Sequence, residues 1–228
     1  MKRVPVVLWG MMLGVLAFTG CARHKDLESL NREQARVIAD LNREVGSLQD
    51  ELERMKFSRE ELVKAKEELE TRLKSELEGG GLSVEMQERG LVVTVLDRVL
   101  FDPGKAEIKD SARTTLDKVA DVLKSRVPEH LVYVEGHTDN DPIRYSGWRS
   151  NWELSTARAT EVIHYFVESQ GVNPARLIAA GFGEFHPVAA NDTLVGKARN
   201  RRVEIVITPK KITELIKQAL ETRHAPSN

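Results

Sequence analysis

The sequence predicts an α/β two-layer sandwich with a mixed sheet, preceded by a long N-terminal α-helix or coiled coil. Three observations carry this prediction. Residues 26–78 contain no proline and one glycine, and their leucines recur every seven residues. A glycine triplet follows at 79–81. From residue 82 to residue 208, short apolar runs alternate with amphipathic helical stripes, the pattern of a β-α-β-α-β chain with helices on one face of a sheet.

The N-terminal residues have the sequence pattern of an export signal. Two basic residues precede an uncharged apolar run at 4–17, and Phe18-Thr19-Gly20 then leads to Cys21, the one cysteine of the chain. This order predicts a signal peptide over residues 1–20. The Thr19-Gly20-Cys21 ending resembles a bacterial lipobox, which implies acylation of Cys21. The alternative is an uncleaved signal anchor, because the run approaches the roughly 17–25 residues of a spanning helix.

Residues 21–78 are predicted to form a helical spacer. One column of the seven-residue repeat holds Leu27, Leu41, Leu48, Met55, Leu62 and Leu69. The flanking apolar positions are Leu30 and Val37 in the first part and Val45, Leu52 and Leu73 later. This pattern indicates a coiled coil, with residues 26–78 as the place where a second copy or an envelope protein would bind. The alternative is a helix that folds back on its own domain, and Arg59 and Lys66 at seam positions favour a weak or interrupted coil.

The first half of the domain predicted at 82–208 begins with a hairpin. Strands are expected at 82–87 and 91–96, joined by a turn at Arg89-Gly90. A loop at 101–104 precedes a helix that Asp110 or Ser111 is expected to cap. Its apolar stripe is Ala112, Leu116, Val119, Ala120 and Leu123.

The second half continues the alternation. A strand is predicted at 131–135, and Ser150 with Glu153 forms a capping box that opens a helix extending to about residue 170. A short strand at 177–180, a helical turn at 197–201 and a final strand at 203–207 follow. Pro209 ends that strand, and residues 209–228 are predicted to hold a C-terminal amphipathic helix that starts near Ile212.

Two opposite charges mark a candidate binding site. Asp139 lies in the loop after the predicted strand at 131–135. Arg158 lies between Leu154 and Val162 and so interrupts an apolar helix face, which Asn151 shares. A guanidinium on such a face needs an acceptor, because an unpaired buried charge is costly. Two acceptors remain open: Asp139 itself, in a structural salt bridge, or a ligand with an ammonium and a carboxylate that Asp139 and Arg158 bind together.

Beyond these charged residues, five motifs occur in order along the chain and together carry a resemblance to a known protein family. They are Phe101-Asp102-Pro103-Gly104 with Ile108, residues 134–140, residues 151–159, residues 180–184 and residues 200–204. Over residues 82–208 the chain resembles the OmpA-like C-terminal domain, a family that binds the peptide stem of peptidoglycan non-covalently. The resemblance implies that Asp139 and Arg158 hold diaminopimelate. It also implies supporting roles for Thr138, Asn140 and Asn151, with the loop of Asp102 closing one side.

The loop at 141–150 resembles the flagellar stator branch of this family, MotB, more than the porin branch. A stator subunit has a spanning helix with a proton-accepting aspartate, whereas residues 4–22 contain no acidic residue. A stator role is therefore not expected. Trp148 in this loop is expected to anchor the loop on the core, the alternative being stacking on a sugar ring.

Other classes of function are disfavoured. A net charge of -1 and a pI of about 6.6 give no field for nucleic acid. His137-x-Asp139-x-Asp141 lacks a second cluster for a metal, and Ser155 lacks the strand–turn–helix context of a nucleophile. No enzyme activity, metal or cofactor is expected. Of Arg201 and Arg202, one is expected to support the pocket or pair with Glu204, and the other to be solvated.

Together these features predict a lipid-anchored envelope protein that binds the cell wall. Ala22 follows Cys21 where an aspartate would mark retention in the inner membrane, so the periplasmic face of the outer membrane is the expected location. The alternatives are a coiled-coil envelope scaffold and a MotB-like wall-binding protein anchored in the inner membrane.

Overall fold

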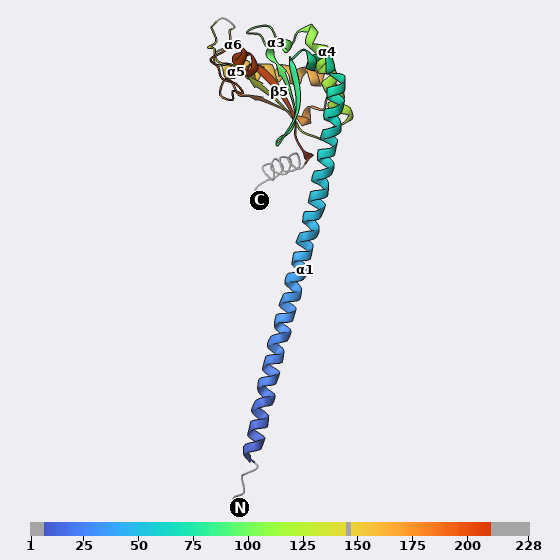
Figure 1. The fold of residues 1–228 in the computed structure, drawn as a ribbon, viewed down its shortest axis with the longest axis vertical. Coiled ribbons are helices and arrows are strands. Elements are labelled where there is room, and N and C mark those ends of the chain that lie inside the picture. The colour runs from blue at the N-terminus through green and yellow to red at the C-terminus, as the bar shows by residue number, and fades with distance from the viewer. Residues whose placement is uncertain (1–6, 145–146, 211–228) are drawn as a thin grey trace, which may run out of the picture. The chain divides into compact units, whose positions relative to one another are not determined.

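The computed structural model describes residues 7–144 and 147–210, with side chains from Leu27 onwards (Figure 1). The chain divides into two compact units, Met1–Glu53 and Arg54–Asn228. Three predicted features lie outside the described residues: the basic start of the signal peptide, the side chain of Cys21 and the helix from Ile212. Within the part that is described, no helix has an apolar stretch long enough to cross a bilayer.

Helix α1 (Val7–Arg72) confirms the predicted long N-terminal helix. In the first unit its apolar side chains are about half exposed, as expected for a helix whose apolar column packs against no other part of the chain that the structure describes. The residues concerned are Leu27, Leu30, Val37, Ile38, Leu41, Val45, Leu48 and Leu52. The coiled coil itself stays a prediction.

The second unit contains a mixed five-stranded sheet, as the sequence predicts. Its strands are β1 (Leu82–Gln87), β2 (Gly90–Leu96), β3 (Val132–His137), β4 (Leu177–Gly181) and β5 (Arg202–Ile207). The spatial order is β1-β2-β5-β3-β4, with β3 and β4 parallel and the other neighbours antiparallel. The C-terminal strand β5 therefore lies at the centre of the sheet.

Alternate residues of the central strands face the core. Helices α4 (Asp110–Ser125) and α5 (Asn151–His164) contribute to the same core, and the predicted stripe of α4 is fully buried. The core residues of the central strands are Leu91, Val93, Val95, Val132, Val134, Val203, Ile205 and Ile207. Because strand side chains alternate, the residues between these face the opposite side of the sheet.

The last turns of α1 belong to this core. Leu62, Ala65 and Leu69 follow helical spacing and are almost completely buried, as is Leu73 directly after the helix. Ion pairs reinforce the contact, including one between Lys210 and Glu61 at 2.9 Å. The predicted alternative of a helix that folds against its own domain therefore describes this part of α1. The compact unit begins at Arg54, well before the predicted domain start at residue 82.

The glycine triplet makes a turn inside this unit, where the sequence predicts a hinge. It follows α2 (Lys74–Glu78), and Gly80 has a φ of 63°, which suits a residue without Cβ. The carbonyl of Gly81 accepts a hydrogen bond from the amide of Leu96 at 2.9 Å, and the carbonyl of Gly80 accepts one from Arg98 at 3.1 Å. These bonds tie residues 79–81 to the end of β2.

The helix starts correct one prediction and partly support another. The N-cap of α4 is Lys109, which makes no side-chain cap, so the predicted capping by Asp110 or Ser111 is wrong. Asp110 is the first helical residue, where its charge suits the positive end of the helix dipole. Ser150 does cap α5 by accepting from the amide of Glu153. The Glu153 carboxylate, however, accepts from the amide of Arg149 at 2.8 Å instead of closing the box on Ser150.

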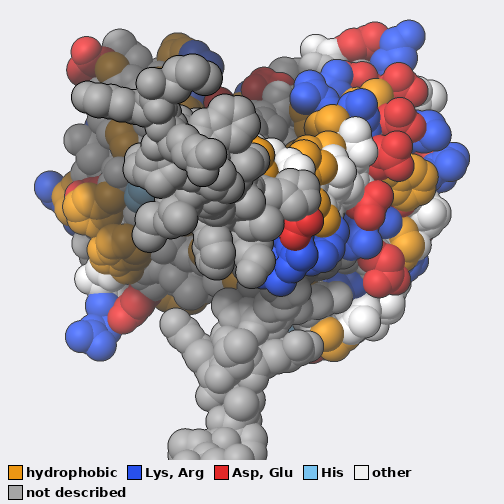
Figure 2. Space-filling view, turned by 90° about the horizontal axis from the view of Figure 1, so that it is seen from below, with side chains coloured by type: hydrophobic (Ala, Val, Ile, Leu, Met, Phe, Trp, Pro, Cys, Tyr) orange, Lys and Arg blue, Asp and Glu red, His pale blue; other side chains and the backbone are white. Residues whose placement is uncertain are grey.

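The remaining short elements link the sheet to its helices. They are α3 (Asp97–Leu100), a π-helical turn at Tyr165–Ser169 that extends α5, a 3-10 turn at Pro174–Arg176 and α6 (Leu194–Asn200). Where Figure 2 shows described side chains, basic and acidic groups are interleaved, in keeping with the net charge of -1.

The burial of α1 gives a stability prediction. Leu69→Ala should lower the free energy of unfolding of a fragment of residues 54–228 by about 2–5 kcal/mol, because it leaves a cavity in a closed core. Val63→Ala in the same helix removes an exposed side chain and should change it by less than about 0.5 kcal/mol. Denaturant unfolding measures both, and equal effects would show that α1 is not part of the core.

Candidate ligand-binding site

Close backbone packing positions the candidate site. A Cβ on Gly136 of β3 would collide with the carbonyl oxygen of Ser155 in α5, and one on Gly181 of β4 would collide with the hydroxyl of Thr156. The Ser155 hydroxyl is fully buried and accepts a hydrogen bond from the amide of Gly183 at 3.0 Å. The glycines thus bring the C-terminal ends of β3 and β4 against the first turns of α5, which places the loop after β3 beside that helix.

Asp139 is held at the start of that loop. Its side chain is buried, with 7% of its surface exposed. Oδ1 accepts a hydrogen bond from the amide of Asp141 at 3.1 Å, and Oδ2 forms an ion pair with Nη1 of Arg201. Because Arg201 is 39% exposed, this pair lies at the solvent side of the site.

Arg158 is more deeply buried, with 3% of its side chain exposed, and its partner is Asp97 rather than Asp139. Nη1 lies 3.0 Å from Oδ1 of Asp97, the first residue of α3. Nε donates to the carbonyl of Lys105 at 2.9 Å, and the guanidinium lies 5.2 Å from the ring centroid of Phe101. The direct Arg158–Asp139 salt bridge, one of the two alternatives left open by the sequence, is thus replaced by a pair that the sequence did not suggest.

The two ion pairs form one cluster of four charges, in which Asp97, Asp139 and Arg158 are buried and Arg201 is partly exposed. The amide of Asp97 donates to the carbonyl of Arg201 at 3.0 Å, so the pairs are joined through the backbone as well. Burial raises the pKa of Asp97 to about 6, against the opposing effect of Arg158. Burial also lowers the pKa of Arg158, although Asp97 opposes this. The low exposure of both groups makes their mutual neutralisation necessary.

Of the predicted supporting residues in this region, Asn151 and Thr138 are buried and Asn140 is exposed. Asn151 is buried and its amide donates to the carbonyl of Asp141 at 3.1 Å and to Glu184 at 2.8 Å, which fixes the loop after β3 on the start of α5. Thr138 is also buried and donates to the carbonyl of Asp139 at 2.9 Å. Asn140 is exposed beside them.

The loop at 101–105 approaches Arg158, but not through the predicted side chain. Phe101 and the carbonyl of Lys105 make the contacts, whereas Asp102 is about half exposed and lies 3.4 Å from Lys109. Trp148 donates from Nε1 to the carbonyl of Gly104 at 2.9 Å. Trp148 therefore ties the 141–150 loop to the loop at 101–104, whereas the prediction placed its contact on the core.

Sequence reasoning missed Asp97 and placed Arg201 only in part. Asp97 directly follows a predicted strand, which was the one available sign that its carboxylate lies at the same sheet edge as Asp139. Arg201 forms an ion pair with Asp139 and so supports the pocket, which was one of the two expected roles. Arg202 pairs with Glu204 at 2.5 Å, which was the other. The prediction that one of the two arginines is solvated is wrong, because both are engaged and Arg202 is buried.

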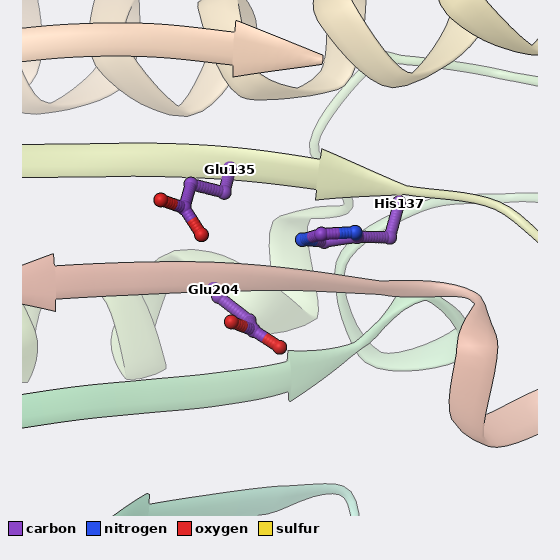
Figure 3. Close-up of side chains that lie close together, drawn as sticks. All are labelled: Glu135, His137 and Glu204. Carbon is purple, nitrogen blue, oxygen red and sulfur yellow. The ribbon is translucent and has the colours of Figure 1, made fainter. Parts of the chain in front are cut away.

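The side chains of His137, Asp139 and Asp141, the loop considered above for a metal, have different surroundings in the structure. Asp139 faces Arg201, and Asp141 lies 2.6 Å from Lys197. His137 instead lies with Glu135 and Glu204 on the sheet, where one donor atom from each lies within 4.8 Å of the others (Figure 3). This second cluster is separate from the four charges around Asp139.

Comparison with known proteins now identifies the family. A profile of the OmpA family matches residues 100–201. Motility protein B of Bacillus subtilis is 35% identical over 169 residues, a match that covers 73% of this chain and 59% of that protein. The solved cell wall anchor of the T6SS from Pseudomonas aeruginosa is 35% identical, with a TM-score of 0.56, and the match covers 62% of this chain and 96% of that one.

The chain belongs to the OmpA family. Among other OmpA-family relatives, the probable lipoprotein YiaD of Escherichia coli is 36% identical over 140 residues, which is 61% of each chain. The chain spans about three-fifths of the length of these curated relatives. The residues that the family profile matches include Asp139, Arg158 and Arg201 of the four-charge cluster but not Asp97, which precedes residue 100.

The raised pKa of Asp97 predicts how stability varies with pH. Since the folded protein binds this proton more tightly than the unfolded chain, ionisation lowers the free energy of unfolding as the pH rises from 4 to 7. A shift of about two pKa units corresponds to about 3 kcal/mol. The difference in unfolding free energy between wild type and Asp97→Asn should fall by that amount over this range.

Denaturant unfolding of residues 54–228 at several pH values measures this difference. Asp192→Asn is the matched control, because Asp192 is exposed, and its difference from wild type should stay constant. A constant difference for Asp97→Asn as well would contradict the raised pKa.

Proposed function

We propose that this OmpA-family protein binds peptidoglycan non-covalently, with Asp139 and Arg158 holding the amino-acid end of diaminopimelate. The observation that carries the proposal is the four-charge cluster, in which two carboxylates and the Arg158 guanidinium are buried and the partly exposed Arg201 completes a neutral balance. A zwitterionic ligand adds an ammonium and a carboxylate and leaves that balance unchanged. A simple anion or cation would leave one uncompensated charge in the site.

The hydrogen bonds leave capacity for such a ligand. Arg158 uses Nε and Nη1 within the fold, and among the described residues no partner is assigned to Nη2. Nη2 is therefore the proposed donor to the ligand carboxylate, beside Nη1 in the guanidinium fork. Each oxygen of Asp139 accepts one bond and has a second lone pair for an ammonium. Asn140, exposed beside Asp139, is proposed to contact the rest of the stem peptide.

We further propose that acylated Cys21 anchors the chain and that the protein tethers the outer membrane to the cell wall. The support is the lipobox resemblance, Ala22 after the cysteine and the likeness to a probable lipoprotein and to a cell wall anchor. The proposed role is non-enzymatic. In support, the hydroxyl of Ser155 is fully buried and engaged with backbone groups at Trp152 and Gly183.

Binding to purified sacculi tests the site. Asp139→Ala in residues 54–228 should abolish co-sedimentation, because the ammonium loses its charged acceptor. Arg158→Lys should weaken the affinity for diaminopimelate by roughly tenfold or more, because a lysine cannot donate from a planar fork.

Two matched controls separate binding from folding. Asp192→Ala and Arg113→Lys make the same chemical changes at exposed positions and should bind as wild type does. Circular dichroism melts establish that each variant is folded. Wild-type binding by folded Asp139→Ala would exclude this carboxylate from the site.

The exposed column of α1 supports a second candidate, an envelope scaffold. We propose that residues 27–52 associate with the same segment of a second copy of this chain. The apolar side chains of this segment recur at heptad spacing and are 47–58% exposed in the single chain. Pairing along the column would bury them in a coiled coil, which is the usual state of such a repeat.

Self-association of residues 27–228 tests the scaffold. Leu48→Glu should abolish any concentration-dependent dimer seen by analytical ultracentrifugation, since it places a charge in the apolar column. Ser47→Glu adds the same charge to the neighbouring position outside the column and should leave the dimer intact. A monomeric wild type at all concentrations would exclude the second copy as the partner.

A further inference from the structure

A pocket of ≈ 340 Å³ opens on the face of the sheet away from the core. Glu135, His137 and Glu204 line it, together with Arg89, Arg202 and His186. Figure 3 shows the first three side chains gathered on neighbouring strands β3 and β5. None of Glu135, His137 and Glu204 belongs to the four-charge cluster or to the proposed wall-binding site.

The strand register explains why the groups meet. Glu135 lies directly opposite Glu204 in the antiparallel β3–β5 pair, and His137 lies opposite Arg202. Side chains two residues apart share one face of a strand, so all four point to the same side. Two carboxylates in direct register repel each other, and they therefore require a cation between them.

Within the chain, Arg89 supplies that cation. Its guanidinium pairs with both Glu135 and Glu204. Arg89 is 41% exposed and comes from the turn between β1 and β2, so it can turn into solvent. Arg202 differs, because it is buried and also donates to the carbonyls of Asn200 and His186. Only Arg89 is thus readily exchanged for another cation.

His137 is the unexplained group of this pocket. Its side chain is buried, with 4% of the residue exposed, and its ring stacks on Phe182 with centroids 5.0 Å apart. Among the residues that the structure describes, neither ring nitrogen has a hydrogen-bond partner. In a neutral imidazole one ring nitrogen is a hydrogen-bond donor and the other is an acceptor. Each such group that is buried without a partner lowers the stability by about 1–3 kcal/mol. A bound species that engages a ring nitrogen would remove part of this cost.

We propose that Glu135, His137 and Glu204 form a site for a divalent transition-metal ion of the zinc type. The donor atoms lie within 4.8 Å of one another, so small side-chain rotations bring them to the roughly 2.0–2.2 Å of zinc–nitrogen and zinc–oxygen bonds. One imidazole with two carboxylates suits zinc or a similar ion better than calcium or magnesium, which prefer oxygen ligands alone. Water or His186, which lines the same pocket, completes the coordination.

Two further features suit the ion. Burial lowers the pKa of His137 to about 3, with Arg202 acting in the same direction, so the imidazole is neutral at physiological pH. Arg202 donates to Glu204 at 2.5 Å and so orients this carboxylate from outside the coordination sphere. Exchange of Arg89 for the ion would join β3 to β5 two residues before Asp139.

Metal titration of the full chain tests the site. The protein is purified in detergent without a histidine tag and in a Cys21→Ser background, which removes its one thiol. Isothermal titration with Zn²⁺ should give one saturable site, and Mg²⁺ should bind at least a hundredfold more weakly. Co²⁺ as a spectroscopic probe should report nitrogen and oxygen ligands.

Three variants make the assignment specific. Glu135→Gln keeps the shape of the side chain and should weaken Zn²⁺ binding at least about tenfold, since even supporting residues of metal sites contribute that much. His137→Gln should weaken it by at least the same factor. Arg89→Gln should strengthen it several-fold, because the competing guanidinium is gone.

The control removes a surface pair instead. His164 lies 3.0 Å from Glu168 on the exposed side of α5, and His164→Ala should leave the Zn²⁺ affinity unchanged. Melting temperatures without metal establish that each variant is folded. The proposal is overturned if wild type shows no saturable Zn²⁺ binding. It is equally overturned if folded Glu135→Gln binds as tightly as wild type, or if only His164→Ala loses binding.

Discussion

The contact between β3 and α5 is the constraint on which the candidate site depends. Gly136 lets the backbone of β3 approach the carbonyl of Ser155, and Gly181 does the same for β4 near Thr156. With any larger residue there, the helix would stand off from the sheet, and Arg158 would move away from Asp97. In the Gly-His-Thr-Asp segment at the end of β3, the glycine allows this close packing, and the aspartate of the site follows that glycine three positions later.

Paired charges, most of them buried, lie on both faces of the sheet. Beside α5, Asp97, Asp139, Arg158 and Arg201 neutralise one another in two pairs. On the opposite face, Glu135 and Glu204 depend on Arg89 and Arg202. Such groups contribute little net stability compared with apolar packing, whereas the removal of one member is strongly destabilising.

The sequence predicted the local elements well, because each depends on neighbours in the chain. Strand alternation, the buried stripe of α4 and the Ser150 cap all follow from short-range patterns. The partner of Arg158 was not predictable in this way, since Asp97 and Arg158 are 61 positions apart in the sequence and meet only through the order β2-β5-β3. For the same reason the heptad pattern of α1 did not reveal where its leucines leave solvent and enter the core at Leu62.

The continuity of α1 has a mechanical consequence. The last turns of α1 lie among core residues, where Leu62 and Leu69 are buried, and ion pairs join Glu68 to Arg126 and Arg72 to Asp121 of α4. A pull on the N-terminal part of α1 would therefore load these side chains together, in shear, before it reached the glycine turn at 79–81. Rows of contacts loaded in parallel resist force better than contacts that open one after another. For a protein fixed at one end, the last turns of α1 would serve as the joint that bears tension.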